Sequence, residues 1–142
     1  MKKEILIIDD YIDYLVEIKK ALCRNGLAKE MIDTSYDIEN AIERIKENEY
    51  RVIISDLKIK GTSKSTVDFL TTIKERFETT EIIVMSAYPE EINAIKDLKI
   101  KHIVEKAQEG KNFISEIIEL IDKIYKLGLT DEDKKNTSVL AH

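Results

Sequence analysis

The stretch Ile5-Leu6-Ile7-Ile8-Asp9-Asp10 decides the fold of this chain. Four consecutive aliphatic residues are typical of a strand that is buried on both faces, and here an acidic pair follows them directly. Three later apolar runs end in the same way. They are Val52-Ile53-Ile54 before Ser55-Asp56, residues 82–85 before Ser86, and Ile103-Val104 before Glu105-Lys106. The carboxyl ends of parallel strands lie on one edge of a sheet, where open α/β folds bind ligands, so we expect these polar side chains to meet there.

Helical periodicity separates the strand-like runs. Apolar residues recur at helical spacing after each run, beginning with Ile12, Leu15, Val16, Leu22 and Cys23, with Gly26 at a position suited to a helix C-cap. The predicted strands are residues 4–8, 31–35, 51–55, 81–85 and 100–104, and the later helices cover about 38–45, 69–77, 89–98 and 113–124.

This alternation predicts an α/β fold of (βα)5 type, a doubly wound, five-stranded parallel sheet. The flavodoxin-like order 2-1-3-4-5 is the one expected for five strands, although periodicity alone does not reveal the order. In that order Asp9, Asp10 and Asp56 would line the crevice between the first and third strands.

Composition limits the function classes. The chain has 142 residues, 43% of them hydrophobic and 36% charged, which suits one globular domain with a well-solvated surface. We place this domain at residues 1–127 and a polar tail or linker start at 128–142. The net charge of -5 argues against direct nucleic-acid binding. The sequence has no membrane-spanning run, and its single cysteine, Cys23, excludes an internal disulfide, so a cytoplasmic protein is expected.

The acids and their neighbours suit phosphoryl chemistry. Clustered carboxylates repel one another unless a cation joins them, and Mg²⁺ prefers such oxygens. A carboxylate can also accept a phosphoryl group, whose oxygens then need donors such as the Ser86 hydroxyl and the Lys106 ammonium. Each residue also has a plainer reading, as a helix cap, a turn residue or a surface lysine. Because all of these residues are expected at the same edge of the sheet, a common phosphoryl-binding site is favoured over these separate structural roles.

These segments resemble the receiver domains of two-component response regulators, over about residues 3–126. Residues 5–10 resemble the acidic-pair strand of that family, 52–57 its phosphoacceptor strand, 83–88 its Ser/Thr-Ala segment and 102–106 its lysine strand. The resemblance implies a CheY-like fold, with Asp56 as phosphoacceptor and Mg²⁺ (or Mn²⁺ in its place) as cofactor. It implies these further roles: Asp9, Asp10, Asp56 and the backbone carbonyl of Lys58 as metal ligands, Ser86 and Lys106 as phosphoryl contacts, and a histidine kinase or phosphotransfer protein as donor.

The chain departs from the family pattern around this core. Ala107 and Lys60 stand where prolines are usual, and Ile103 stands where an aromatic residue commonly couples to the hydroxyl. In the family, the positions of Lys58 and Tyr88 help to set the lifetime of the phosphoryl group. We therefore expect Lys58, Tyr88 and Ile103 to tune the switch.

Three functions compete. The first is a phosphorylation-dependent switch that changes its choice of a downstream protein, without an output domain in these residues; it is not an enzyme beyond its own phosphorylation and dephosphorylation. The second is a receiver fold that binds partners independently of phosphorylation. The departures from the family pattern at Ile103 and Ala107 favour this function. The third is an aspartate-nucleophile phosphatase, which would need an acid two residues after the nucleophile. Tyr11 follows Asp9 at that distance and Lys58 follows Asp56, so this function ranks last.

Overall fold

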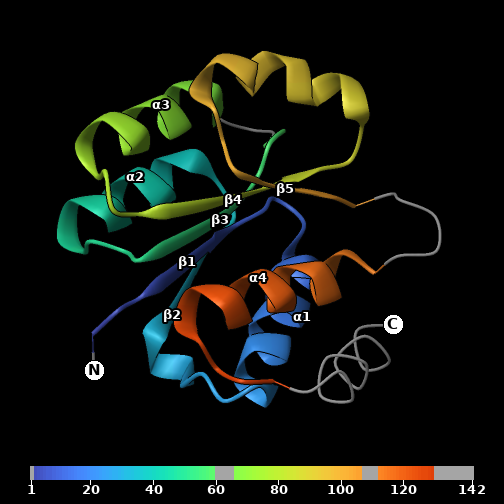
Figure 1. The fold of residues 1–142 in the computed structure, drawn as a ribbon. Coiled ribbons are helices and arrows are strands. Elements are labelled where there is room, and N and C mark those ends of the chain that lie inside the picture. Colours follow the sequence, from blue (N-terminus) through green and yellow to red (C-terminus); the bar gives the residue numbers. More distant parts are fainter. Residues whose placement is uncertain (1, 60–65, 107–111, 130–142) are drawn as a thin grey trace.

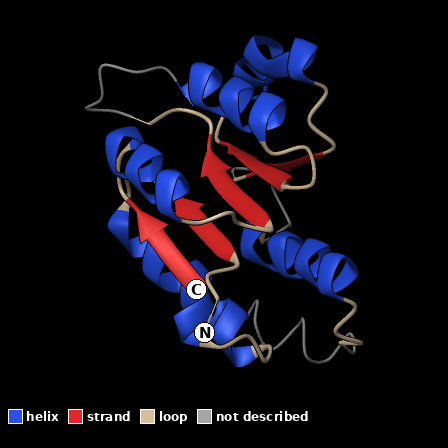
Figure 2. Cartoon of the chain, turned by 90° about the vertical axis from the view of Figure 1, so that its left-hand side faces the viewer, coloured by secondary structure: helices blue, strands red, loops and turns tan. Residues whose placement is uncertain are grey.

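Five short parallel strands form a single sheet in the computed structural model, which describes residues 2–59, 66–106 and 112–129. The strands are β1 (Ile5–Ile8), β2 (Ile32–Ser35), β3 (Val52–Asp56), β4 (Glu81–Ser86) and β5 (His102–Glu105). Their spatial order is β2-β1-β3-β4-β5, and every pairing is parallel (Figures 1 and 2). The predicted (βα)5 fold and its 2-1-3-4-5 order are therefore confirmed.

Helices cover both faces of the sheet. The helical segments are α1 (Ile12–Arg24), η1 (Lys29–Met31), α2 (Ile38–Glu47), α3 (Thr66–Arg76), η2 (Pro89–Leu98) and α4 (Phe113–Tyr125). Figure 1 shows α1 and α4 on one side of the sheet, and α2, α3 and η2 on the other. Within these described segments, no helix has the length and apolar character needed to cross a membrane.

Two apolar clusters, one on each face, make up the core. Successive side chains of a strand point to opposite faces. Ile5 and Ile7 of β1 accordingly belong to the cluster under α1 and α4, whereas Leu6 and Ile8 belong to the cluster under α2, α3 and η2. All four residues of β1 are fully buried, which explains why the chain needs an unbroken aliphatic run at this place.

The structure corrects the predicted inward face of the first helix. Ile12 and Val16 were counted with Leu15 and Leu22 in one apolar helical pattern, yet they are 61% and 45% exposed. The buried face of α1 is formed by Leu15, Ile18, Ala21 and Leu22, and Cys23 is only half-buried at its edge. The error arose because Ile12 and Val16 are themselves one turn apart, so they make an apolar pattern of their own. Gly26 follows the helix with a φ of +99°, as a helix-ending glycine should.

Two predictions near the end of the sheet also needed correction. Residues 89–98 were expected to form an ordinary short helix, but they form a 3-10 helix with only Ile95 fully buried. Strand β5 spans residues 102–105 instead of 100–104. The reason is that Lys99 adopts a left-handed conformation after η2, and pairing with β4 begins only where His102 stands opposite Ile83.

Strand register brings the polar ends together. Ile8 is opposite Ser55, Asp56 is opposite Met85, and Ser86 is opposite Glu105. Asp9, Asp56, Ser86 and Lys106 therefore stand at nearly the same level of the carboxyl edge, each at the end of its strand or one residue beyond it.

Candidate functional site

Three carboxylates meet at this edge. Asp9, Asp10 and Asp56 each offer an oxygen, and these oxygens lie within 4.8 Å of one another. Asp9 and Asp56 are buried, whereas Asp10 lies closer to solvent. The Asp9 Oδ1 atom accepts a hydrogen bond of 2.9 Å from the Tyr11 backbone N–H, which fixes the carboxylate at the start of α1. Such a group of hard oxygen donors fits Mg²⁺, which takes a few carboxylates and keeps several waters.

Lys106 reaches into the acidic group from β5. Its Nζ atom lies 2.6 Å from Asp9 Oδ2 and 3.3 Å from Asp56 Oδ1, and only 9% of its side chain is exposed. The Lys106 backbone N–H donates to the Ser86 carbonyl at 2.8 Å, which continues the β4–β5 pairing to this residue. Burial favours the neutral amine, but the bond to Asp9 and the charges of Asp56 and Asp9 outweigh burial and hold the pKa of Lys106 above its usual value.

The Asp56 carboxyl group titrates at an unusually high pH. Its pKa is raised to about 6, chiefly because burial disfavours the charged form. The charge of Lys106 lowers the pKa of Asp56, while the charges of Asp9 and Asp10 raise it. The nearby acids and the low exposure thus outweigh the one ammonium, and a bound cation would relieve this imbalance.

The Ser86 hydroxyl belongs to the same edge but points elsewhere. Ser86 is fully buried, and its Oγ atom donates to the Tyr88 carbonyl at 2.7 Å. Ser86 therefore stands at the same edge of the sheet as Asp56, while its hydroxyl donates to a backbone acceptor.

An open pocket of about 330 Å³ exposes the acids to solvent. Its walls include Asp10, Asp56 and Lys106, together with Lys58, Tyr88 and Glu91. Tyr88 is largely exposed, and its backbone N–H donates to Glu91 Oε1 at 3.0 Å. Lys58 and Tyr88 thus flank the site as predicted, whereas Ile103 lies partly exposed on β5 and is not among the residues that line this pocket. Lys60 and Ala107 lie outside the described residues.

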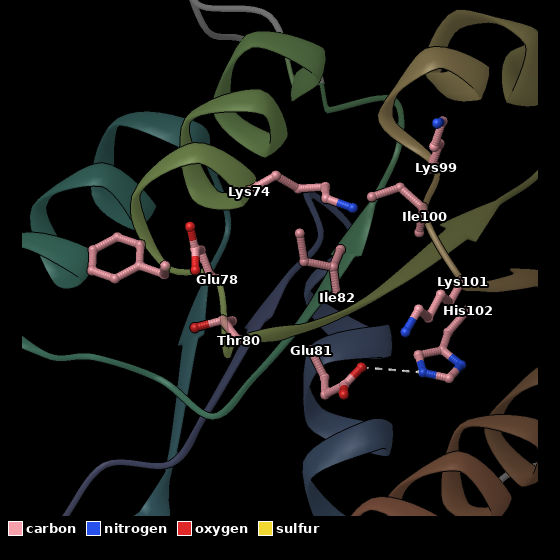
Figure 3. A pocket seen from close by; sticks show the side chains of 10 residues that line it. Lys74, Glu78, Thr80, Glu81, Ile82, Lys99, Ile100, Lys101 and His102 are labelled. Carbon is pink, nitrogen blue, oxygen red and sulfur yellow. Dashed lines mark ion pairs between the residues drawn. The ribbon is translucent and has the colours of Figure 1, made fainter.

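A second hollow lies at the opposite edge of the sheet. It has a volume of about 150 Å³ and is lined by Lys74, Lys101 and the ion pair between His102 and Glu81, which are 3.3 Å apart (Figure 3). Among the described residues, the group of three carboxylates lies at the carboxyl edge and not in this hollow, so the acidic pocket is the stronger candidate for phosphoryl chemistry.

Sequence reasoning missed two residues of the site, Tyr14 and Glu91. Tyr14 packs beside Lys106, with the ammonium 4.7 Å from the ring centroid. Its signal was an aromatic residue in the first turn after the acidic pair. Glu91 follows Pro89 in the first turn of η2, a position where an acid is common for capping alone.

Comparisons with known proteins agree with this geometry. The model of the response regulator receiver domain family matches residues 5–122. A sequence comparison with curated proteins gives no significant match.

Solved structures show the same fold. The response regulator DrrB of Thermotoga maritima, an OmpR/PhoB homolog, is 16% identical with a TM-score of 0.71; the alignment covers 89% of this chain and 54% of DrrB, so this chain spans about half of that protein. The isolated REC domain of RcsB from Salmonella enterica serovar Typhimurium, solved with the phosphomimetic BeF3⁻, is 22% identical (TM-score 0.70; 96% and 99% covered). TrrA of Thermotoga maritima, in complex with Mg²⁺-BeF, is 23% identical (TM-score 0.67; 88% and 98% covered). Because the family model spans the chain from β1 into α4, this chain belongs to the response regulator receiver domain family.

Proposed function

We propose that this chain is a phosphorylation-dependent signalling receiver that accepts a phosphoryl group on Asp56 from a histidine kinase or a phosphotransfer protein. The observation that carries the proposal is the placement of Lys106 between Asp9 and Asp56, inside a group of three carboxylates. The alternative, a module that binds partners without phosphorylation, would not need this costly concentration of buried charge.

The proposed step is an attack by an Asp56 carboxylate oxygen on the phosphorus of a phosphohistidine. A P–O bond forms to Asp56, the P–N bond breaks, and its electron pair stays with the imidazole nitrogen, so that no oxidant or reductant is needed. With a pKa of about 6, the Asp56 carboxyl is mostly ionised at neutral pH, as a nucleophile must be. Attack by water on the same phosphorus would later break the P–O bond and release inorganic phosphate.

Asp9, Asp10, Asp56 and the Lys58 backbone carbonyl would hold the Mg²⁺ ion, and Mn²⁺ would substitute for it. When bound, the ion would neutralise charge on the carboxylates and on the phosphoryl oxygens. TrrA, whose fold this chain shares, was solved with Mg²⁺-BeF, which supports the proposal.

Lys106 and Ser86 would bind the remaining phosphoryl oxygens. The Lys106 ammonium already lies 3.3 Å from the Asp56 carboxylate, which would carry the phosphoryl group. The Ser86 hydroxyl would first have to leave the Tyr88 carbonyl, and Lys58, Tyr88 and Ile103 would adjust the rate of switching and the lifetime of the phosphoryl group. The altered surface would then select a downstream protein. We take residues 1–127 as the signalling unit, and a cytoplasmic location follows from the proposed partners.

Acetyl phosphate provides a direct test. Incubation with acetyl phosphate and Mg²⁺, followed by intact-mass analysis, should give a single phosphoryl adduct that disappears in Asp56→Asn and persists in Asp97→Asn, a matched change at an exposed acid. A wild-type protein without an adduct, or an adduct that survives Asp56→Asn, would favour the phosphorylation-independent module.

A further inference from the structure

The ammonium of Lys106 has a third neighbour besides the two carboxylates. The Nζ atom lies 4.7 Å from the centroid of the Tyr14 ring, within the range of a cation–π interaction. Asp9 lies at 2.6 Å and Asp56 at 3.3 Å from the same atom. The ammonium thus contacts both an aromatic ring and the acid that we propose as phosphoacceptor.

We propose that Tyr14 is a positioning residue, whose ring holds the Lys106 ammonium at the phosphoacceptor while the carboxylates engage a metal ion. This inference rests on the proposed function. Asp9 would have to serve both the ammonium and a bound cation, so its attraction for Lys106 would weaken once its charge was shared with Mg²⁺. A lysine ammonium stands at the end of a flexible four-carbon chain, so without a fixed partner it does not keep a defined position.

An aromatic ring suits this task better than a further acid. A fourth carboxylate would add to the repulsion among Asp9, Asp10 and Asp56 and would compete for the metal ion. The ring face attracts a cation without a net charge and is a poor ligand for Mg²⁺, which prefers oxygen. A contact between Tyr14 and Lys106 would therefore not compete with a metal ion for its ligands.

Two neighbouring rings fix the orientation of Tyr14. The Tyr11 ring meets it edge to face at 4.7 Å between centroids and an angle of 81°, and the Phe113 ring does so at 5.1 Å and 79°. Phe113 is the buried first residue of α4, so the ring of Tyr14 is held between the start of α1 and the start of α4. Aromatic pairs favour this geometry, which leaves the ring little freedom to turn away.

A double-mutant cycle tests the role. The rate of phosphorylation by acetyl phosphate at saturating Mg²⁺ is compared for the wild type, Tyr14→Leu, Lys106→Met and the double variant. We expect Tyr14→Leu to slow the wild type about three- to tenfold, as the loss of one cation–π contact implies, and to cause no further slowing when Lys106→Met is present. Equal slowing in both backgrounds, or no slowing in the wild type, would overturn the inference.

Conservative variants separate the ring face from simple packing. Tyr14→Phe keeps the ring and should restore the wild-type rate to within about twofold. Tyr36→Leu, at an exposed tyrosine, is the matched control for the loss of an aromatic side chain. Should Tyr14→Leu fail to fold, a fluorinated phenylalanine introduced at Tyr14 keeps the shape but weakens the negative ring face, and it should react more slowly than Tyr14→Phe. Equal rates would contradict the inference.

A nuclear magnetic resonance measurement does not depend on phosphorylation. The ring current of Tyr14 should displace the proton signals of the last Lys106 methylene group in the wild type and in Tyr14→Phe, but not in Tyr14→Leu. If the wild type forms no phosphoryl adduct yet shows this displacement, the proposed function fails and the contact stands. If the adduct forms and the displacement is absent, the inference about Tyr14 fails alone.

Discussion

Asp56→Asn should stabilise the folded protein at neutral pH and leave its stability almost unchanged in acid. The pKa of this carboxyl is raised from 3.8 to about 6, chiefly by burial, so the folded protein binds the Asp56 proton more tightly than the unfolded chain does. A raised pKa contributes stability that is complete below about pH 4 and is lost as the pH rises through about 6. The asparagine variant has no charge to bury at this position and escapes that loss.

The expected gain follows from the size of the shift. Two pKa units correspond to about 3 kcal/mol, and the open side of the pocket brings water to the site, so we expect about 2 to 3 kcal/mol above pH 7. For a domain of this size, that gain would raise the melting temperature by roughly 10 °C. Mg²⁺ should stabilise the wild type more than the variant, because the variant lacks one carboxylate of the cluster.

Urea unfolding followed by far-ultraviolet circular dichroism measures this effect, since the chain has no tryptophan for fluorescence. The wild type, Asp56→Asn and the exposed-site control Asp97→Asn are compared at about pH 4 and about pH 8 with a chelator present. A gain for Asp56→Asn of the same size at both pH values, or no gain at pH 8, would refute the account of the buried charge. The control variant Asp97→Asn should show no gain in stability at either pH.

Three other measurements test neighbouring parts of the account. Lys58→Asn should change the dephosphorylation rate of the Asp56 adduct, as followed by the decay of intact mass after removal of the donor; equal lifetimes would contradict a tuning role for Lys58. Asp10→Asn should weaken Mg²⁺ binding in calorimetric titration by about tenfold or more, because one carboxylate of three is lost, and unaltered affinity would remove Asp10 from the proposed ligands. Asn112→Ala should lower the unfolding free energy by about 1 kcal/mol, because the Asn112 side chain accepts from the backbone N–H groups of Ile114 and Ser115 at the start of α4. A loss below the error of the unfolding measurement would mean that this cap is unimportant.

The carboxyl edge of the sheet was predictable because strand patterns are read from short, local signals. A buried parallel strand is a continuous aliphatic run, and its end is marked by the first polar residue, so Asp9, Asp56 and Ser86 could be placed on one edge from the sequence. The exposed face of α1 could not be predicted from the sequence, because Ile12 and Val16 have the same helical spacing as residues that face the core. Only the packing of α1 against α4 shows that Leu15 and Ile18 face the core.

The contacts of the site depend on long-range placement, which periodicity does not contain. Lys106 and Tyr14 are far apart in the chain, and they meet only because β5 and the start of α1 converge at the same edge. The bond from Ser86 to the Tyr88 carbonyl is local, yet nothing in the sequence distinguishes it from a hydroxyl that points to Asp56. Sequence reasoning therefore found which residues gather, whereas the structure shows which of them are already engaged.

Both groups proposed to bind the phosphoryl oxygens are engaged before any phosphoryl group arrives, Ser86 with the Tyr88 carbonyl and Lys106 with Asp9. A neutral hydrogen bond contributes about 1 kcal/mol, and a hydrogen bond to a charged acceptor contributes about 1.5 to 3 kcal/mol. The Ser86 hydroxyl would therefore prefer a phosphoryl dianion to the Tyr88 carbonyl by a modest margin. The freed Tyr88 carbonyl immediately precedes Pro89, the first residue of η2. This 3-10 helix has a single fully buried side chain, Ile95, and so little packing opposes its rearrangement. With Ile103 in place of the usual aromatic partner, we therefore expect the start of η2 to be the element that phosphorylation shifts most readily.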